Sequence, residues 1–245
     1  MPSTSGGAGS LLRVIGVVER IWRYPVKSTG GEPLHQVDVD ARGLRGDRLF
    51  AVRDAEGKFG SGKNTRRFRR MPGLLELRSR YLDDADEPEL LDPRGAVVAD
   101  PTAYLRGYLG RDDVEVAREA AVSHFDQLPL SVLTTATLDW VRSVVPEVPV
   151  DERRFRPNLL VRTPPGTPPF AEDEWFGSKA RIGGLCVEFV RSSERCAMVN
   201  DAQRDLPRSA QVLRAIAKAH DTRLDALATV ATPGSVQVGD GVVLL

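Results

Sequence analysis

The sequence contains few of the residues from which disulfide-linked or metal-clustered proteins are built. Its 245 residues include two cysteines, Cys186 and Cys196, and three histidines, His35, His124 and His220. Two thiols exclude a disulfide framework, a four-thiolate iron–sulfur cluster and a cysteine-rich zinc site formed within this chain. The histidines show none of the short spacings that are typical of a metal-binding helix.

The sequence also lacks an excess of charge of one sign and any long hydrophobic run. Its 34 Lys and Arg residues balance 34 Asp and Glu residues, so we expect no nucleic acid partner held by the overall field of the protein. No apolar run approaches the ~20 residues of a membrane span. Residues 1–10 have neither the basic start nor the apolar core of a signal peptide. The sequence predicts a cytoplasmic protein with no membrane span and a disordered tail over residues 1–10.

The remaining composition is that of an ordinary globular protein, with 41% hydrophobic and 28% charged residues. In the first third of the chain, β-branched and aromatic residues, in places alternating with polar ones, predict short strands. We expect these strands over residues 12–22, 36–40, 48–53 and 74–78, with a hairpin turn at 54–57. Short strands separated by Gly and Asp turns favour a small barrel or sandwich.

The later part of the chain mixes strands with helices. Asp100 and Pro101 are typical of a helix start, and Gly110 of its end. Thr134 or Thr135 is expected to cap a second helix. A domain boundary is expected within about residues 110–124. Further predictions are strands over 130–133, 159–161 and 185–190, a helix around 212–219 and a closing hairpin over 236–244. The fold class is therefore mainly β with helices (α+β).

Residues 57–64 nearly match the phosphate-binding P-loop pattern. The last position holds Asn64 where a magnesium-binding Ser or Thr is required. Residues 71–73, Met-Pro-Gly, break the chain where a long helix must follow. We therefore set aside a nucleotide hydrolase, although Lys63 and the neighbouring glycine amides could still contact an anion.

Basic residues cluster around Phe68. One interpretation is a nucleic-acid patch, and the other is a solvated strand edge that resists edge-to-edge pairing. The zero net charge favours the second, with one or two of the residues lining a pocket. The cluster comprises Lys63, Arg66, Arg67, Arg69 and Arg70.

Four short polar segments flank predicted strands, where loops commonly build sites. Their cations Lys27, Arg48 and Arg156, together with Asn158, have the donor groups that bind a phosphate and a polar heterocycle. Taken one by one, each cation is better explained as a surface charge or as part of a salt bridge. The segments are residues 24–28, 46–48, 154–158 and 192–196.

The two cysteines lie in different surroundings. Cys186 falls in an apolar stretch and is expected in the core, like most lone cysteines. Cys196 falls in a polar segment beside Arg195, and a neighbouring guanidinium favours the thiolate that acts as a nucleophile or metal ligand. Its local sequence leaves both a structural and a functional role open.

The motifs YPVKS, GLRGDR, FRPNLLV and SERC, in this order and spacing, resemble the MOSC family. MOSC denotes the C-terminal domain of molybdenum cofactor sulfurases. The resemblance implies an N-terminal β-barrel domain over residues 11–115 and a MOSC β-barrel domain over 120–245. The arrangement is similar to that of the mitochondrial amidoxime-reducing component and its bacterial relatives.

The resemblance also implies a molybdenum cofactor site and its residues. Cys196 matches the cysteine that binds molybdenum through sulfur and is the expected catalytic residue. A soft thiolate suits such a metal. The positions that match, or lie near, family contacts to the pterin and its phosphate are Lys27, Ser28, Arg48, Lys63, Thr134, Thr137, Arg156, Asn158 and Arg195.

By the same resemblance, the expected function is an oxidoreductase that takes oxygen from N-hydroxylated or N-oxide small molecules. Its electrons would come from a separate flavin or iron–sulfur reductase. Two alternatives stay open: a sulfur carrier or sulfurtransferase with a persulfide on Cys196, and a non-catalytic carrier of the cofactor.

Overall fold

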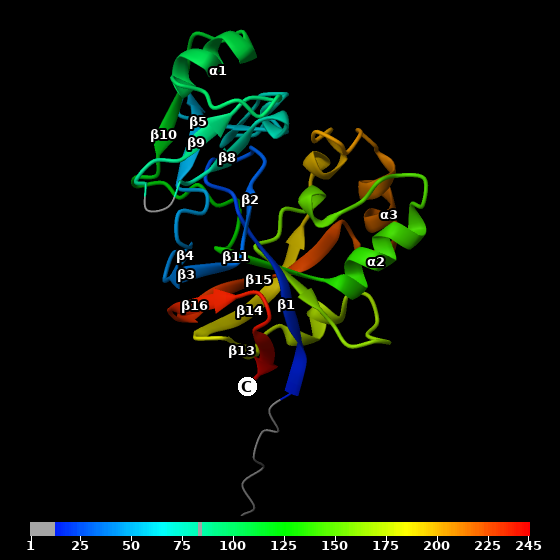
Figure 1. Cartoon of the computed structure of the whole chain (residues 1–245). Coiled ribbons are helices and arrows are strands. Elements are labelled where there is room, and N and C mark those ends of the chain that lie inside the picture. Colours follow the sequence, from blue (N-terminus) through cyan, green and yellow to red (C-terminus); the bar gives the residue numbers. More distant parts are fainter. Residues whose placement is uncertain (1–12, 83–84) are drawn as a thin grey trace, which may run out of the picture.

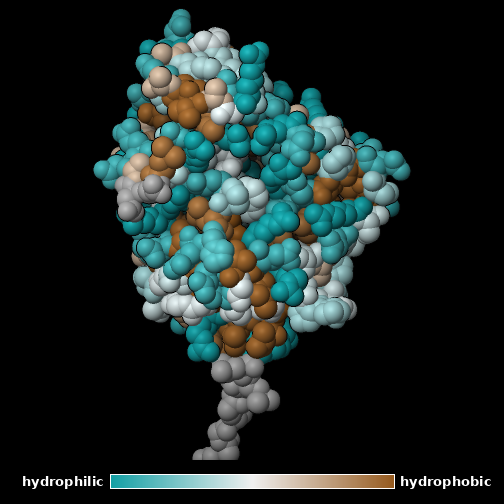
Figure 2. Space-filling view, viewed as in Figure 1, coloured by the Kyte–Doolittle hydropathy of each residue, from teal (hydrophilic) through white to brown (hydrophobic). Residues whose placement is uncertain are grey.

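The computed structural model describes residues 13–82 and 85–245 of the chain (Figure 1). The predicted disordered tail over residues 1–10 lies outside the described residues. The chain folds into a barrel, drawn in the lower part of Figure 1, and a smaller lobe above it that ends in helix α1. Hydrophilic residues dominate the face in Figure 2, where apolar residues form scattered groups.

The first part of the chain supplies ten strands and one helix to the described structure. They are β1 (Arg13–Arg23), β2 (Glu32–Leu34), β3 (Gln36–Asp40), β4 (Gly43–Leu44), β5 (Phe50–Asp54), β6 (Phe59–Ser61), β7 (Phe68–Arg70), β8 (Arg78–Arg80), β9 (Glu89–Leu91), α1 (Pro101–Leu109) and β10 (Val114–Arg118).

The later part supplies the remaining described elements. They are β11 (Leu130–Thr134), α2 (Thr135–Val144), β12 (Leu159–Arg162), β13 (Lys179–Ile182), β14 (Leu185–Glu194), α3 (Gln211–His220), β15 (Arg223–Thr232), β16 (Gly234–Gln237) and β17 (Gly241–Leu244), with short 3₁₀ turns η2 (Glu152–Arg154), η3 (Ala171–Trp175) and η4 (Ala197–Asn200). A further 3₁₀ turn, η1 (Leu74–Glu76), lies in the first part, between β7 and β8.

Seven of the described strands close into a barrel. They follow the order β12-β11-β15-β14-β13-β17-β1, and β1 pairs with β12 to complete the circle, while β2 extends the sheet beyond β1. Alternation fills the interior: Leu185, Val187 and Phe189 of β14 are fully buried, and the residues between them are half-buried or exposed. Closure leaves no open edge on these strands, which protects them from pairing with other chains.

Strand β1 is the contribution of the N-terminal segment to this barrel. It pairs with β12 on one side and β17 on the other, and its register shifts between Val14 and Gly16. A Cβ atom at Gly16 would lie 2.5 Å from Val161 Cγ1 and 2.6 Å from the Arg162 carbonyl oxygen. Glycine therefore lets β1 approach β12 closely enough to close the barrel.

The other strands form smaller sheets. Four strands pair in the order β10-β5-β6-β7, three in the order β16-β3-β4, and β8 pairs with β9. Asp100 is the N-cap of helix α1, with its side chain accepting from the Ala103 N–H at 2.9 Å, and the left-handed Gly110 is the C-cap. Both helix ends agree with the sequence prediction.

Helices α2 and α3 lie side by side against the outside of the barrel (Figure 1). Their apolar faces share one cluster with barrel residues, in which Leu138, Val141, Val212 and Ile216 are buried against Leu160. Thr134 is the N-cap of α2, accepting from the Thr137 N–H at 3.1 Å. In the described part of the chain, no helix has the length and apolar character needed to cross a membrane.

The predicted fold class, mainly β with helices around a barrel, is confirmed. Three local predictions were wrong. Residues 74–78 begin with the turn η1, because Gly73 adopts the left-handed conformation (φ 92°) and Leu74 and Leu77 are buried on the same side. The predicted closing hairpin is absent: of the described strands, β16 pairs with β3, whereas β17 pairs with β1 and β13.

The third wrong prediction concerns the end of the strand that starts at Leu185. This strand, β14, continues to Glu194 because it pairs along its length with β15, a strand that the sequence analysis did not identify. Cys196 therefore follows directly on a long strand, two residues beyond its end.

Candidate functional site

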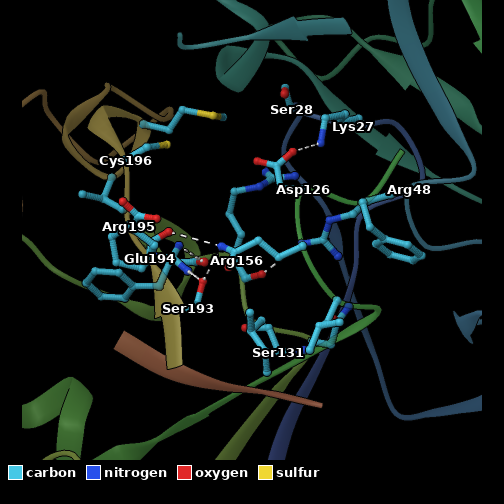
Figure 3. A pocket seen from close by; sticks show the side chains of 18 of the residues that line it. Lys27, Ser28, Arg48, Asp126, Ser131, Arg156, Ser193, Glu194, Arg195 and Cys196 are labelled. Carbon is cyan, nitrogen blue, oxygen red and sulfur yellow. Dashed lines mark hydrogen bonds and ion pairs between the residues drawn. The ribbon is translucent and has the colours of Figure 1, made fainter. Parts of the chain in front are cut away.

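A cavity of about 560 Å³ lies where the segments that follow or precede β1, β5, β12 and β14 converge (Figure 3). We call it the Cys196 cavity. In Figure 3, Cys196 and Arg195 lie on one side, and Lys27, Ser28 and Arg48 lie on the other. Eight of the ten residues predicted for the site line it: Lys27, Ser28, Arg48, Lys63, Arg156, Asn158, Arg195 and Cys196.

Three of these residues adopt a backbone conformation that is unusual for a side chain. The φ angles are 66° at Ser28, 50° at Arg48 and 58° at Arg156. Each such conformation costs on the order of 1–3 kcal/mol and persists only where the surroundings enforce it, most often at functional sites. Sharp turns therefore direct residues from three separate segments at one cavity.

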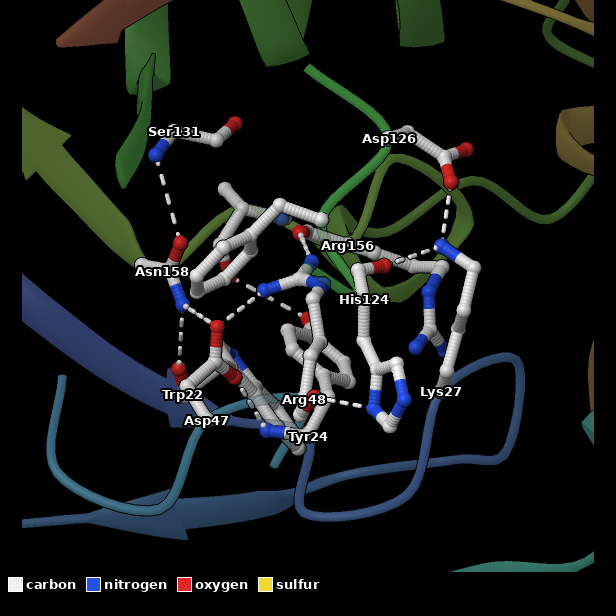
Figure 4. A network of polar contacts seen from close by, with 12 residues as sticks. Trp22, Tyr24, Lys27, Asp47, Arg48, His124, Asp126, Ser131, Arg156 and Asn158 are labelled. Carbon is white, nitrogen blue, oxygen red and sulfur yellow. Dashed lines mark hydrogen bonds and ion pairs between the residues drawn. The ribbon is translucent and has the colours of Figure 1, made fainter. Parts of the chain in front are cut away.

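Asp47 joins the two parts of the chain beneath the cavity (Figure 4). Its fully buried carboxylate accepts from the Tyr24 N–H at 2.7 Å and from Asn158 Nδ2 at 3.1 Å, and it forms an ion pair with Arg48. Asn158 Oδ1 in turn accepts from the Ser131 N–H at 3.2 Å. The side-chain amide of Asn158 thus connects Asp47 to Ser131, and it fixes the wall of the cavity that Asn158 and Ser131 line.

Lys27 lies nearly buried at the far side of the cavity. Its Nζ donates to the His124 carbonyl at 2.7 Å and forms an ion pair with Asp126, which also lies 3.6 Å from Lys63 Nζ. Burial lowers the pKa of Lys27 to about 8, although Asp126 favours its charged form. For Asp126, burial would raise the pKa, but Lys27 and Lys63 together bring it down to about 2.

Two arginines share one aromatic ring. The Arg156 guanidinium carbon lies 4.2 Å from the centroid of Tyr24, and that of Arg48 lies 4.8 Å from it. Arg156 Nη1 donates to the Thr29 carbonyl at 2.5 Å, and Arg48 Nη2 to the Arg156 carbonyl at 3.2 Å. Burial, with Arg48 nearby, lowers the pKa of Arg156 to about 10, so a bound anion would stabilise both charges.

Cys196 is half-buried at the cavity wall, and no hydrogen bond to its sulfur is present among the described residues. The adjacent Arg195 is anchored by Asp225 at 3.1 Å and by the Phe155 carbonyl at 2.5 Å. Arg195 Nε is buried without a partner in the described structure. Burial raises the pKa of Asp225 to about 6, against the opposing effect of Arg195.

Arg154 is a cavity residue that the sequence analysis did not single out. It is 1% exposed, and its guanidinium donates to backbone carbonyls, including Pro149 at 3.0 Å, Val199 at 3.4 Å and Pro207 at 2.7 Å. It thereby holds the turn η4 that follows Cys196. Its neighbours in the sequence, Arg153 and Phe155, form no pattern that would distinguish a buried arginine at this position from a surface charge.

Two predicted residues lie away from the cavity. Thr134 and Thr137 are fully buried and do not line the Cys196 cavity. The Thr134 N–H and hydroxyl both donate to Glu172 Oε1 at 2.9 Å, and the Thr137 hydroxyl donates to Glu172 Oε2 at 2.7 Å. They bind this buried carboxylate at the start of α2 instead.

Cys186 also differs from its prediction. It is half-buried on β14, at a position that alternates with the inward-facing Leu185 and Val187. It is therefore not a core residue, because the alternation of the strand directs it out of the barrel.

The lining is rich in positive charge. Among the described residues that line the Cys196 cavity, seven are Lys or Arg and two, Asp126 and Glu194, are acidic. The unpartnered Arg195 Nε adds a donor that needs an acceptor. No group of three or more His, Cys, Asp or Glu residues within the described chain could hold a metal ion. A thiol beside donors and cations fits an anionic group that brings most of its own metal ligands.

Fold and site together define a β-barrel protein with a cation-lined cavity and one thiol at its wall. The chain belongs to the MOSC domain family, whose model matches residues 119–243. A second model, the MOSC N-terminal beta barrel domain, matches residues 15–95.

Two named relatives are similar to parts of the chain. Mitochondrial amidoxime-reducing component 1 of Homo sapiens is 25% identical over 231 residues, covering 77% of this chain and 67% of that protein. A molybdenum cofactor sulfurase of Oryza sativa subsp. japonica is 43% identical over 54 residues, covering 22% of this chain and 6% of that protein. The chain therefore spans about two thirds of the first relative and a small fraction of the second.

Among solved structures, the YUAD protein of Bacillus subtilis has a similar fold. It superimposes with a TM-score of 0.52 at 11% identity, covering 95% of this chain and 96% of that one. This likeness concerns the fold alone.

Proposed function

We propose that the chain binds a molybdenum cofactor in the Cys196 cavity and reduces N-hydroxylated or N-oxide small molecules. The family is shown by the MOSC domain match, and the distant relation to amidoxime-reducing components supports the reaction class. The observation that carries the proposal is the half-buried, unpaired sulfur of Cys196 at the wall of a cavity rich in cations.

The residues of the cavity divide into two roles. Cys196 would supply the protein's sulfur ligand to the metal. Lys27, Arg48 and Arg156 present cationic donors that would hold the anionic part of the cofactor. Arg195 lies beside the thiol and carries a free Nε donor, which favours negative charge there.

When bound, the cofactor would supply the two-electron chemistry of the reaction. In balance, an N-hydroxyl substrate takes up two electrons and two protons, its N–O bond breaks, and an N–H bond and water form. The electrons would come from a separate flavin or iron–sulfur reductase. The protein positions the cofactor, and Arg154 keeps the turn after Cys196 in place.

The proposal is tested by metal and pterin analysis after expression in a host that makes the cofactor. We expect the purified wild-type protein to contain molybdenum and pterin, each in an amount close to that of the protein itself. Cys196→Ser should lose reduction of an N-hydroxylated amidine, and Cys186→Ser, the matched thiol control, should keep it. Wild-type protein that is folded but free of molybdenum and pterin would overturn the proposal.

The same experiment separates two alternative functions. The local match to a molybdenum cofactor sulfurase favours a sulfur-carrying role as the second candidate. That role predicts a cyanide-labile extra sulfur on Cys196 by mass spectrometry, with no molybdenum bound. A cofactor carrier would instead hold molybdenum and pterin but show no turnover with any N-hydroxylated compound and reductant.

A further inference from the structure

A second cavity, of about 260 Å³, adjoins the first. Arg156 lines both, and the second cavity is closed by β1, by the start of β8 and by the segment that follows η4. We call it the Arg78 cavity. It contains neither the thiol nor Lys27, so it is a separate binding space.

The walls of the Arg78 cavity are largely apolar and partly aromatic. The rings of Trp22 and Tyr24 lie nearly parallel, at 18°, with centroids 6.4 Å apart. Leu75 adds an aliphatic surface, and at Gly31 a Cβ atom would lie 2.5 Å from Tyr24 Cδ1. Glycine backbone and aromatic faces suit a flat, apolar ligand body.

The charged groups of this cavity are all of one sign. Among its described lining residues four are arginines and none is acidic. Arg153 is satisfied by Asp151 and Asp205. Arg78 and Arg204 form no ion pair with any residue that the structure describes. Burial lowers the pKa of Arg78, and the nearby Arg204 charge acts in the same direction.

Gln203 adds a donor without an acceptor. The residue is 6% exposed, lines the Arg78 cavity, and its Nε2 has no hydrogen-bond partner in the described structure. Buried donors of this kind are rare in proteins unless a ligand or a water molecule accepts a hydrogen bond from them. Gln203 Nε2 is thus a buried donor in the wall of the Arg78 cavity that an acceptor oxygen of a ligand would complete.

We infer that the Arg78 cavity binds a small planar carboxylate. The carboxylate would accept from Arg78, Arg204 and Gln203 Nε2, and the ring would pack against Trp22 and Leu75. A cavity slightly below the usual range for drug-sized ligands suits a compound of a single ring.

Calorimetric titration of the purified full chain with benzoate tests the inference, with benzamide as the neutral probe of equal shape. We expect benzoate to bind at millimolar or lower concentration, and benzamide at least about tenfold more weakly. Arg78→Gln should weaken benzoate binding at least about tenfold. Arg80→Gln is the matched control, because Arg80 lies on the same strand, bonds Glu89 at 2.9 Å and does not line the cavity.

A second variant tests the inference even if Arg78→Gln fails to fold. Arg204 is exposed, so Arg204→Gln should leave the fold intact and still weaken benzoate binding. Equal affinities for benzoate and benzamide, or equal effects of the Arg78 and Arg80 substitutions, would overturn the inference. Loss of benzoate binding in Lys27→Met would also overturn it by placing the ligand in the Cys196 cavity, and the proposed function would stand untouched.

Discussion

At the scale of single residues, the Cys196 cavity is built from groups that are held at a cost. Lys27 is nearly buried, and three other residues that line the cavity have positive φ angles. Arg156 is anchored by the Thr29 carbonyl, and Arg195 by Asp225 and the Phe155 carbonyl, with its Nε left without a partner in the described structure. A folded chain keeps such features when a ligand or a reaction uses them.

Lys27 provides a direct test of this environment. Its folded pKa, about 8, lies below the ordinary value of 10.5 because the charge is buried. The folded protein therefore releases this proton first as pH rises, so Lys27 makes stability increase between pH 8 and 10.5. ¹³C NMR of the lysine Cε resonances should show one midpoint near pH 8.

The assignment comes from Lys27→Arg, which should remove only that resonance. A Lys27 midpoint at the ordinary lysine value of 10.5 would contradict the statement that burial outweighs the Asp126 ion pair at this charge.

Residue patterns located most of this site but not its supports. The four motifs contain Lys27, Arg48, Arg156 and Cys196, and all four residues line one cavity. Arg154 and Asp126 were missed. For Arg154 the reason is that a buried arginine that bonds carbonyls and a surface arginine look the same in sequence. Of the two predicted candidates for the helix cap, Thr134 is the one that caps α2, and its hydroxyl contacts Glu172 and not the cavity.

At the scale of elements, the start of α2 depends on a buried carboxylate. Glu172 is 2% exposed, accepts from Thr134 and Thr137, and forms no ion pair with a described residue. Burial raises its pKa, so the charged form is disfavoured in the fold. Protonation at acid pH therefore relieves a cost that the native protein carries at neutral pH.

Glu172→Gln tests this balance by removing the charge while keeping the shape of the side chain. Wild-type stability should rise relative to Glu172→Gln as pH falls from 7 towards the ordinary glutamate value of 4.5. The free energies of unfolding come from urea denaturation at several pH values. Glu174→Gln, on the same turn but 65% exposed, should show no such trend. A pH-independent difference between wild type and Glu172→Gln would refute the account.

Elements were predicted well where the pattern was local. Strand β3 and both ends of α1 agree with the sequence analysis, because alternation and capping act over a few residues. The closing hairpin was wrong because β16 and β17 find their partners far away in the chain. Pairing across such distances is decided by how the barrel closes, which no short window contains.

At the scale of the whole molecule, the two matched family segments are interwoven. The MOSC N-terminal model covers residues 15–95, yet β1 from this segment completes the barrel of the later strands. The Cys196 cavity likewise draws Lys27 from one part and Cys196 from the other. Zero net charge is therefore compatible with a strongly cationic cavity, since the site depends on local convergence.

A chain that begins at residue 119 tests the interweaving. It lacks β1, so β12 and β17 would each present an open edge, and we expect no cooperative thermal transition by circular dichroism. Supplying a peptide of residues 13–34, which contains β1 and β2, should restore a transition. A shortened chain that melts at the temperature of the full chain would show that β1 is dispensable.

We propose above all that the Cys196 thiolate binds molybdenum inside a cation-lined cavity. X-ray absorption at the molybdenum edge of the loaded protein measures the sulfur atoms around the metal. We predict one fewer sulfur neighbour in Cys196→Ser than in wild type, and no change in Cys186→Ser. An identical sulfur shell in wild type and Cys196→Ser would contradict the claim.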